Sequence, residues 1–162
     1  MLFSRKDETP DIYLRVVTPD DCDILLEWEN DPVNRQYAFH PEQIKREDHI
    51  KWFERKFADE NCLIYIVHET DNLGDRIGAV RYEIEDGAAI VSIVIAPEWR
   101  GNGYGLAAQM AADALLFRSC DDIDRIVAEI LNHNIPSINM FFKAGYVLKD
   151  SNTKFKTLEK RR

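Results

Sequence analysis

The sequence predicts an α/β domain in which helices flank a mixed, mainly antiparallel, twisted sheet. Short apolar or alternating runs are interspersed with helix-like segments along most of the chain. Asp86-Gly87 separates two apolar runs, and this dipeptide is typical of a tight antiparallel hairpin. A glycine-rich turn at residues 100–105 then connects a strand to a helix. Together these features predict one layer of strands covered by helices.

The first elements follow from alternation and from helix start signals. Residues 12–17 alternate and predict a strand. Thr18-Pro19-Asp20-Asp21 supplies a capping hydroxyl, a first-turn proline and acids that face the helix dipole. A helix is therefore expected to reach about Trp28, where Asn30-Asp31-Pro32 ends it. A second helix is expected at residues 47–57, with its apolar residues on one side.

The remaining elements form a regular succession of strands, turns and helices. Strands are expected at residues 62–68, 77–85 and 88–95, separated by turns at 71–75 and 86–87. After the glycine-rich turn, we expect a helix at 106–117, a strand at 125–131, a helix at 136–143, and short strands at 146–149 and 154–158. With 162 residues and no linker or repeat, the chain is expected to form a single domain spanning residues 1–162.

Arg100-Gly101-Asn102-Gly103-Tyr104-Gly105 is a candidate anion site, because unpaired N–H groups and the positive dipole end at a helix N-terminus attract phosphate. The glycines let a bulky anion approach the backbone closely. A nucleotide P-loop would end in Gly-Lys-Ser/Thr, whereas this loop continues as Leu106-Ala107. A dinucleotide fingerprint would need a third glycine where Leu106 stands. The spacing that fits is Arg-x-x-Gly-x-Gly.

This spacing resembles the coenzyme A pyrophosphate loop of the GNAT acyltransferases. Residues 134–146 resemble the second signature of that family, and the order of elements matches the GNAT fold along nearly the whole chain. The resemblance implies acetyl-CoA as co-substrate, no metal, and a strand that supplies amides and carbonyls to the pantetheine arm. The residues that it assigns to the coenzyme are Ile93, Ile95, Arg100, Gly101, Asn102, Gly103, Tyr104, Gly105 and Asn134.

The resemblance also points to the groups that move protons. Glu129 stands where related protein N-terminal acetyltransferases have a glutamate that acts as base on the amine. Such a base is needed because only a free amine can attack the thioester carbonyl; the alternative is an outward-facing Glu129 paired with a Lys or Arg. Phe141 departs from the family, which often has a tyrosine there to protonate the thiolate, and Tyr104, Ser137 and Tyr146 are the other possible donors. Without a placed cysteine nucleophile, direct transfer in a ternary complex is expected.

Three segments, residues 28–35, 49–53 and 78–82, resemble the GNAT branch that acetylates nucleotide-linked amino sugars, including the flagellin-modifying pseudaminic acid pathway. The resemblance implies a small-molecule amine acceptor, preferably a 4-amino-4,6-dideoxy sugar on a nucleotide diphosphate. The residues that it assigns to the acceptor are Asn30, Arg35, His49, Trp52 and Arg81. His49 and Trp52 can equally be packing residues. The alternatives are a protein α-amine, as in the ribosomal-protein branch, and a non-catalytic acyl-CoA-binding module.

Composition and net charge limit the kinds of partner and the compartment that are expected. The net charge of −8 argues against nucleic acid, which needs a basic face. No apolar run reaches membrane-spanning length, and the charged start at residues 1–10 predicts no signal peptide. The three cysteines, without a CxxC pair, are expected to be buried thiols in a reducing cytoplasm. The family resemblance also allows a homodimer.

Overall fold

A seven-stranded sheet forms the centre of the molecule, in a computed structural model that describes residues 9–70 and 74–162. Most of the expected charged start, residues 1–8, and residues 71–73 of an expected turn lie outside the described residues. The strands are β1 (Ile12–Val16), β2 (Cys62–Glu69), β3 (Arg76–Glu85), β4 (Ala88–Ile95), β5 (Arg125–Leu131), β6 (Val147–Ser151) and β7 (Phe155–Arg161). Their order is β1-β2-β3-β4-β5-β7-β6, and only β4 and β5 pair in parallel. The mixed, mainly antiparallel sheet is confirmed.

Five α-helices accompany these strands in the described residues: α1 (Cys22–Glu29), α2 (Pro32–Gln36), α3 (Arg46–Phe57), α4 (Tyr104–Ser119) and α5 (Ile135–Lys143). The first expected helix is divided, because residues Pro19–Asp21 form a 3₁₀ turn before α1. Helix α2 was not expected from the sequence. Its N-cap Asp31 accepts hydrogen bonds from the backbone N–H groups of Val33 and Asn34, so the segment that ends α1 also starts α2.

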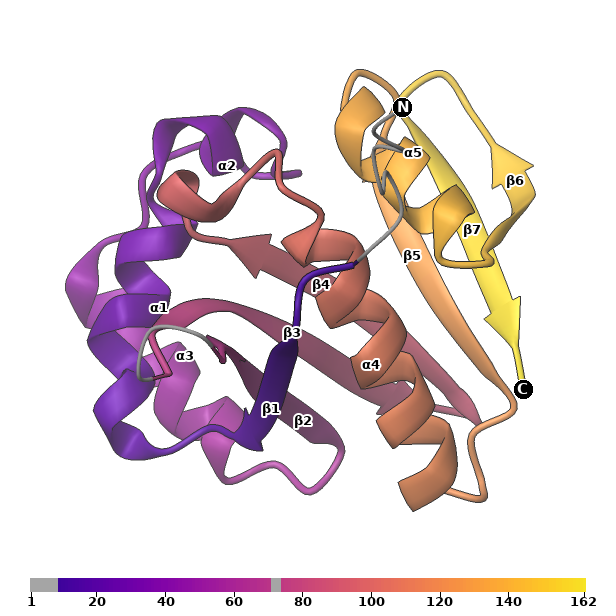
Figure 1. Cartoon of the computed structure of the whole chain (residues 1–162). Coiled ribbons are helices and arrows are strands. Elements are labelled where there is room, and N and C mark those ends of the chain that lie inside the picture. Colours follow the sequence, from indigo (N-terminus) through magenta and orange to yellow (C-terminus); the bar gives the residue numbers. More distant parts are fainter. Residues whose placement is uncertain (1–8, 71–73) are drawn as a thin grey trace, which may run out of the picture.

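The alternation of apolar side chains along the strands gives the sheet two covered faces. Tyr65 and Val67 of β2 pack in one core with α4 and α5, whereas Ile64 and Ile66 pack in a second core with α1 and α3. Successive residues of a strand face opposite sides, so one strand can serve both cores. Figure 1 shows α4 crossing one face of the sheet, with β5, β7 and β6 beyond it.

Two further observations concern the expectations drawn from composition. Cys62 is buried, but Cys22 and Cys120 are only half-buried, so the expected burial of all three thiols was wrong for two of them. No helix in the described part of the chain is long and apolar enough to cross a membrane.

Candidate active site

The parallel pairing of β4 with β5 is short, and the two strands separate beyond it. The ladder joins residues 88–90 to residues 125–127. Past this point a cavity of about 710 Å³ opens, lined by residues 91–95 of β4 and residues 128–130 of β5. Within the described chain, the facing backbone groups of the two strands have no partner across this gap. Buried backbone groups need hydrogen-bond partners, so an extended ligand with amide groups of its own would satisfy these edges.

The glycine-rich loop closes one end of this cavity. It follows β4 through a 3₁₀ turn at Pro97–Trp99 and leads directly into α4. Gly101 and Gly103 have φ angles of 79° and 85°, a left-handed backbone that side chains with a Cβ disfavour. Gly103 is the N-cap of α4 and supplies no side-chain cap. Binding of an anion at the start of α4 stays a prediction.

Arg100 fixes this loop to the strand before it and to α2. Its Nε donates to the carbonyl oxygen of Ile95 at 3.0 Å, and its Nη1 donates to Asp31 Oδ2 at 2.8 Å. Burial opposes ionisation of Asp31, but the hydrogen bond from Arg100 and those from two backbone N–H groups outweigh it and lower its pKa. The Arg100 Nη2 is buried and donates to no described residue.

The other predicted coenzyme residues lie around the same end of the cavity. Ile93 and Ile95 line it from β4, and Gly105 lines it from the first turn of α4. Asn102 is exposed and donates from Nδ2 to the Arg100 carbonyl oxygen. Tyr104 is half-buried and packs its ring edge-to-face with Trp99. Gly101, Asn102, Gly103 and Tyr104 are outside the lining of the cavity, so their contacts with coenzyme stay predictions.

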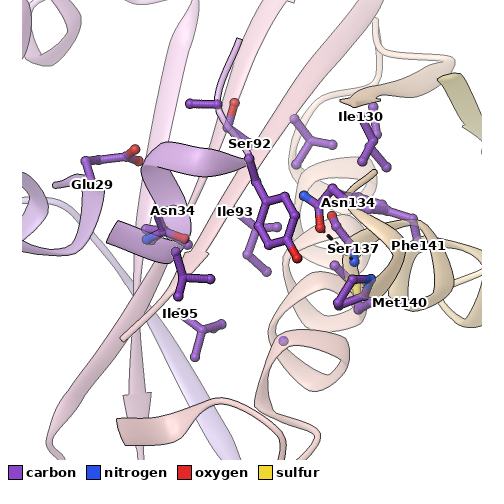
Figure 2. Close-up of a pocket in the computed structure, with 18 of the residues that line it drawn as sticks. Glu29, Asn34, Ser92, Ile93, Ile95, Ile130, Asn134, Ser137, Met140 and Phe141 are labelled. Atoms are coloured by element: carbon purple, nitrogen blue, oxygen red, sulfur yellow. Dashed lines mark hydrogen bonds between the residues drawn. The ribbon is translucent and has the colours of Figure 1, made fainter. Parts of the chain in front are cut away.

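Helix α5 forms the opposite wall. Asn134 is its N-cap and accepts a hydrogen bond at Oδ1 from the backbone N–H of Ser137. Figure 2 shows Asn134, Ser137, Met140 and Phe141 on the α5 side of the cavity, across from Ile93 and Ile95 of β4. Asn134 therefore lines the cavity, and its contact with the coenzyme stays a prediction. Its Nδ2 donates to no described residue.

Two of the possible proton donors, Tyr104 and Tyr146, lie outside the lining of the cavity. The Tyr146 hydroxyl donates to Asp113 Oδ1 at 3.1 Å in a buried cluster that also includes Tyr82 and Gln109. Burial, reinforced by the Asp113 carboxylate, raises the pKa of Tyr146, which makes it a poorer acid. Neither Tyr146 nor Tyr104 lines the cavity, whereas Ser137 does.

Glu129 lines the cavity from β5 with an exposed side chain. Its position is opposite Thr157 of β7 in the sheet register. No residue of the described ranges forms a hydrogen bond or ion pair with its carboxylate, so the alternative role, pairing with a Lys or Arg, is not observed. An unpaired carboxylate at the wall of a coenzyme-sized cavity can accept a proton from an amine.

Of the predicted acceptor residues, Arg35 lines the cavity and is already bonded to the protein. Its Nε donates to the Glu29 carbonyl oxygen at 2.6 Å, its Nη1 to the carbonyl oxygens of His40 and Glu42, and its Nη2 to Glu29 Oε2. Asn30 lies outside the lining and bonds both backbone groups of Ile44, each at 2.8 Å. These two side chains hold the segment after α2. Residues 37–40 of this segment line the cavity and are called here the acceptor wall.

Arg81 lines the cavity as well, whereas His49 and Trp52 do not. The Arg81 guanidinium lies over the Trp52 ring at 5.0 Å from its centroid and donates to Ser92 Oγ at 3.2 Å. Trp52 faces a small adjoining hollow of about 20 Å³ that Arg81 and Glu29 also line. His49 is buried, bonds the Cys22 carbonyl oxygen and stacks on Trp52. The structure therefore brings together Arg35 and Arg81, and places His49 in a packing role.

The sequence did not single out five polar residues of the lining: Glu29, Asn34, Tyr37, His40 and Ser92. Glu29 and Asn34 fall within the segment 28–35 that the resemblance indicated, whereas Tyr37 and His40 follow α2 and Ser92 lies on β4. The signal that was available is Asp31-Pro32, an N-cap followed by a proline at the first helical position. Recognition of α2 there would have extended the candidate acceptor segment from Arg35 to its C-cap Tyr37.

Comparison with known families agrees with this geometry. Residues 11–147 match the family model described as acetyltransferase (GNAT) domain. The chain belongs to the GNAT acetyltransferase family. It is therefore an acetyltransferase with the fold that the two signatures predicted. No curated protein sequence matches this GNAT chain.

Solved structures share the fold of this GNAT acetyltransferase at low identity. A domain from Methanocaldococcus jannaschii is 21% identical, with a TM-score of 0.83 over 94% of this chain and 99% of that one. Spermidine N-acetyltransferase from Vibrio cholerae, in complex with CoA and spermine, is 18% identical, with a TM-score of 0.81 over 93% and 95% of the two chains. Aminoglycoside acetyltransferase AAC(6')-Ib, in complex with coenzyme A, is 20% identical, with a TM-score of 0.78 over 94% and 95%.

Proposed function

We propose that this GNAT acetyltransferase transfers the acetyl group of acetyl-CoA to a primary amine of a small molecule. One observation carries the proposal: a single cavity, of a size usual for ligand sites, extends from the glycine-rich loop end at Gly105 to the carboxylate of Glu129, which bonds no other residue of the described chain. The coenzyme end and the amine end of the reaction are thus in one space. Solved structures of similar fold with coenzyme A bound are consistent with the same co-substrate.

The arrangement suits direct transfer without a covalent enzyme intermediate. The pyrophosphate would bind the N–H groups at the start of α4, and the pantetheine arm would lie along the open edge of β4. Glu129, directly or through a water, would take the proton of the acceptor amine, whose nitrogen then attacks the thioester carbonyl. Backbone N–H groups near Ile95 would stabilise the charge that develops on the carbonyl oxygen. In the described part of the chain, no group of three or more His, Cys, Asp or Glu side chains is arranged to hold a metal.

A small molecule fits the acceptor wall better than a protein N-terminus. Residues 37–40 line the cavity, and Arg35 holds this segment through the carbonyl oxygens of His40 and Glu42 at 3.0 and 3.3 Å. The same guanidinium also donates to the Glu29 carbonyl oxygen, so it joins α1 to the segment that forms the wall. These hydrogen bonds oppose the opening of the wall that a peptide chain would need. The protein α-amine is therefore the runner-up acceptor.

Among small amines, a nucleotide-linked amino sugar is the finer proposal. Arg81 supports it, because Arg81 lines the cavity and its guanidinium lies over the Trp52 ring. Its Nε is buried and ion-paired with Glu83 Oε1 at 3.6 Å, so a phosphate would contact the outer end of the guanidinium. Arg35 adds little to this site, since its donors already bond protein oxygens. Arg81 would therefore be the main residue that binds the diphosphate.

The test is release of free coenzyme A thiol from acetyl-CoA with three acceptor panels. The panels are nucleotide-linked amino sugars, small polyamines and aminoglycosides, and peptides with free N-termini. We expect turnover with small amines, and with the sugars above the others. Turnover confined to peptides would overturn the small-molecule acceptor. Coenzyme binding without turnover on any panel would overturn catalysis and favour a non-catalytic acyl-CoA-binding module.

A further inference from the structure

The reaction needs an acid, and Phe141 of α5 cannot provide one. When the C–S bond of the tetrahedral intermediate breaks, the sulfur departs as a thiolate, and a phenol placed nearby can give it a proton. Phe141 of α5 lines the cavity but has no proton to give. Its ring packs edge-to-face on Tyr146 at a centroid distance of 4.8 Å, and the hydroxyl of Tyr146 is bonded to Asp113.

Among the tyrosines, position in the structure leaves one candidate for the proton donor. The chain has six tyrosines, and Tyr37 is the one that lines the cavity. Tyr65, Tyr82 and Tyr146 are buried in the main core, where the hydroxyls of the last two donate to Asp113. Tyr13 is on the edge strand β1, with its ring stacked on His68, and Tyr104 packs against Trp99.

Tyr37 is held beside the connection between β5 and α5. Its backbone N–H donates to the Asn34 carbonyl oxygen at the end of α2, and its ring lies 5.5 Å from that of His133. His133 Nε2 in turn bonds the Gln36 carbonyl oxygen at 2.9 Å. Because His133 immediately precedes Asn134, these contacts place Tyr37 next to the α5 end of the cavity. Its side chain is half-buried, and its hydroxyl forms no hydrogen bond with any residue of the described ranges.

We propose that Tyr37 is the proton donor to the coenzyme A thiolate, in place of the tyrosine that Phe141 replaces; this inference rests on the proposed acetyl transfer. The amine loses one proton to Glu129, its nitrogen bonds the carbonyl carbon, and the C–S bond breaks with its electron pair on sulfur. The Tyr37 O–H proton passes to that sulfur, giving free coenzyme A thiol. Glu129 then gives its proton to water and water returns one to the Tyr37 phenolate, so both side chains are restored and the sum is amine plus acetyl-CoA giving amide plus coenzyme A.

The first test compares Tyr37→Phe with the wild-type protein, using the amine that the wild type acetylates fastest. The variant keeps the ring contact with His133, so the fold is preserved. We expect kcat to fall by about 100-fold, the lower range of general acid catalysis, with the Kd for acetyl-CoA unchanged. The matched control is Tyr13→Phe, which removes a phenol outside the cavity and leaves kcat unchanged. A Tyr37→Phe variant within twofold of the wild type would overturn the proposal.

A pH profile separates a proton donor from a packing residue. A phenol that must be protonated gives the wild-type kcat an alkaline limb that declines with rising pH, and Tyr37→Phe lacks this limb. A lower kcat with the alkaline limb retained would overturn the acid role of Tyr37. Loss of kcat and of this limb in Ser137→Ala, with Tyr37→Phe unaffected, would assign the role to Ser137 instead. Absence of wild-type turnover with every amine would remove the proposed function itself, and the Tyr37 inference with it.

Discussion

At the scale of single residues, Glu129 is the base in the proposed acetyl transfer. Its carboxylate lines the cavity and bonds no described residue, so the Glu129→Gln change removes a base without breaking a structural contact. We expect kcat/KM to fall by about 100-fold at neutral pH, the lower range of general base catalysis. The rate of the variant should rise steadily with pH, because solution deprotonates the amine. The Kd for acetyl-CoA should not change.

The control for this prediction is Glu85→Gln, which alters an exposed carboxylate at the end of β3, away from the cavity. It should behave as the wild type in the same coenzyme A release assay. A Glu129→Gln variant with normal kcat/KM at neutral pH would show that water or another group accepts the proton.

At the scale of elements, the glycine-rich loop combines backbone geometry with binding. Gly103 has a φ of 85°, and an added Cβ would lie 3.3 Å from Pro10 Cδ. The change Gly103→Ala should lower the free energy of unfolding by about 1–2 kcal/mol, because side chains disfavour this backbone. It should also raise the Kd for coenzyme A by about tenfold or more, which corresponds to 1.4 kcal/mol. Titration calorimetry measures the second effect.

Gly87→Ala is the matched control for the loop. Gly87 has a φ of 76° in the turn between β3 and β4, and an added Cβ would meet Asp122 O at 3.5 Å. Its loss of stability should be similar, while the Kd for coenzyme A should remain that of the wild type. Equal weakening of binding by both variants would mean that the loop acts through stability alone.

A change at Arg35 of α2 tests how this short helix supports the acceptor wall. The Arg35→Lys change keeps the charge but loses most of the fixed set of donors that reaches Glu29, His40 and Glu42. We expect the free energy of unfolding to fall by roughly 1–3 kcal/mol and the KM for the acceptor to rise. The Kd for acetyl-CoA should be unchanged, and an unchanged acceptor KM would contradict a role in shaping this wall.

What the sequence could predict at this scale depended on local signals. Short apolar runs and Asp86-Gly87 predicted the strands with small errors at their ends, because strands buried on both faces are apolar along most of their length and the dipeptide marks a tight turn. The α2 segment was missed because Asn30-Asp31-Pro32 serves as the end of one helix and the cap of the next. The geometry of the glycine-rich loop was predictable, since glycines mark positions with a positive φ angle. The contacts of Tyr37 and Arg35 were not, because they join segments that are distant in the sequence.

At the scale of the whole molecule, Asp21 joins the N-terminal strand to β3 at the start of α1. Its side chain is fully buried and accepts hydrogen bonds from Arg15 at 2.7 and 2.8 Å, from Arg76 at 3.1 Å and from the Thr18 backbone N–H at 2.8 Å. Burial opposes its ionisation, but the bonds from Arg15, Thr18 and Arg76 outweigh this effect and lower its pKa well below 3.8.

This lowered pKa predicts how stability depends on pH. Because the folded state holds Asp21 ionised more strongly than the unfolded state does, its contribution is fully present above the unfolded pKa of about 3.9. It is lost progressively as the pH falls below that value toward the lower folded pKa. Asp21→Asn should therefore reduce the free energy of unfolding at pH 7 by about 2 kcal/mol. We expect a smaller loss in this variant than in the wild type as the pH falls from 4 to 2.

Asp23→Asn provides the control, because Asp23 pairs with Arg46 across an exposed surface, where such pairs contribute little. Urea unfolding at several pH values compares the two variants with the wild type. Asp21 does not line the cavity, so the folded Asp21→Asn protein should keep its kcat and its Kd for acetyl-CoA. Parallel acid unfolding of wild type and Asp21→Asn would instead show that other carboxylates set the acid limit. A lowered kcat at neutral pH would mean that the β1–α1 junction also controls the geometry of the acceptor wall.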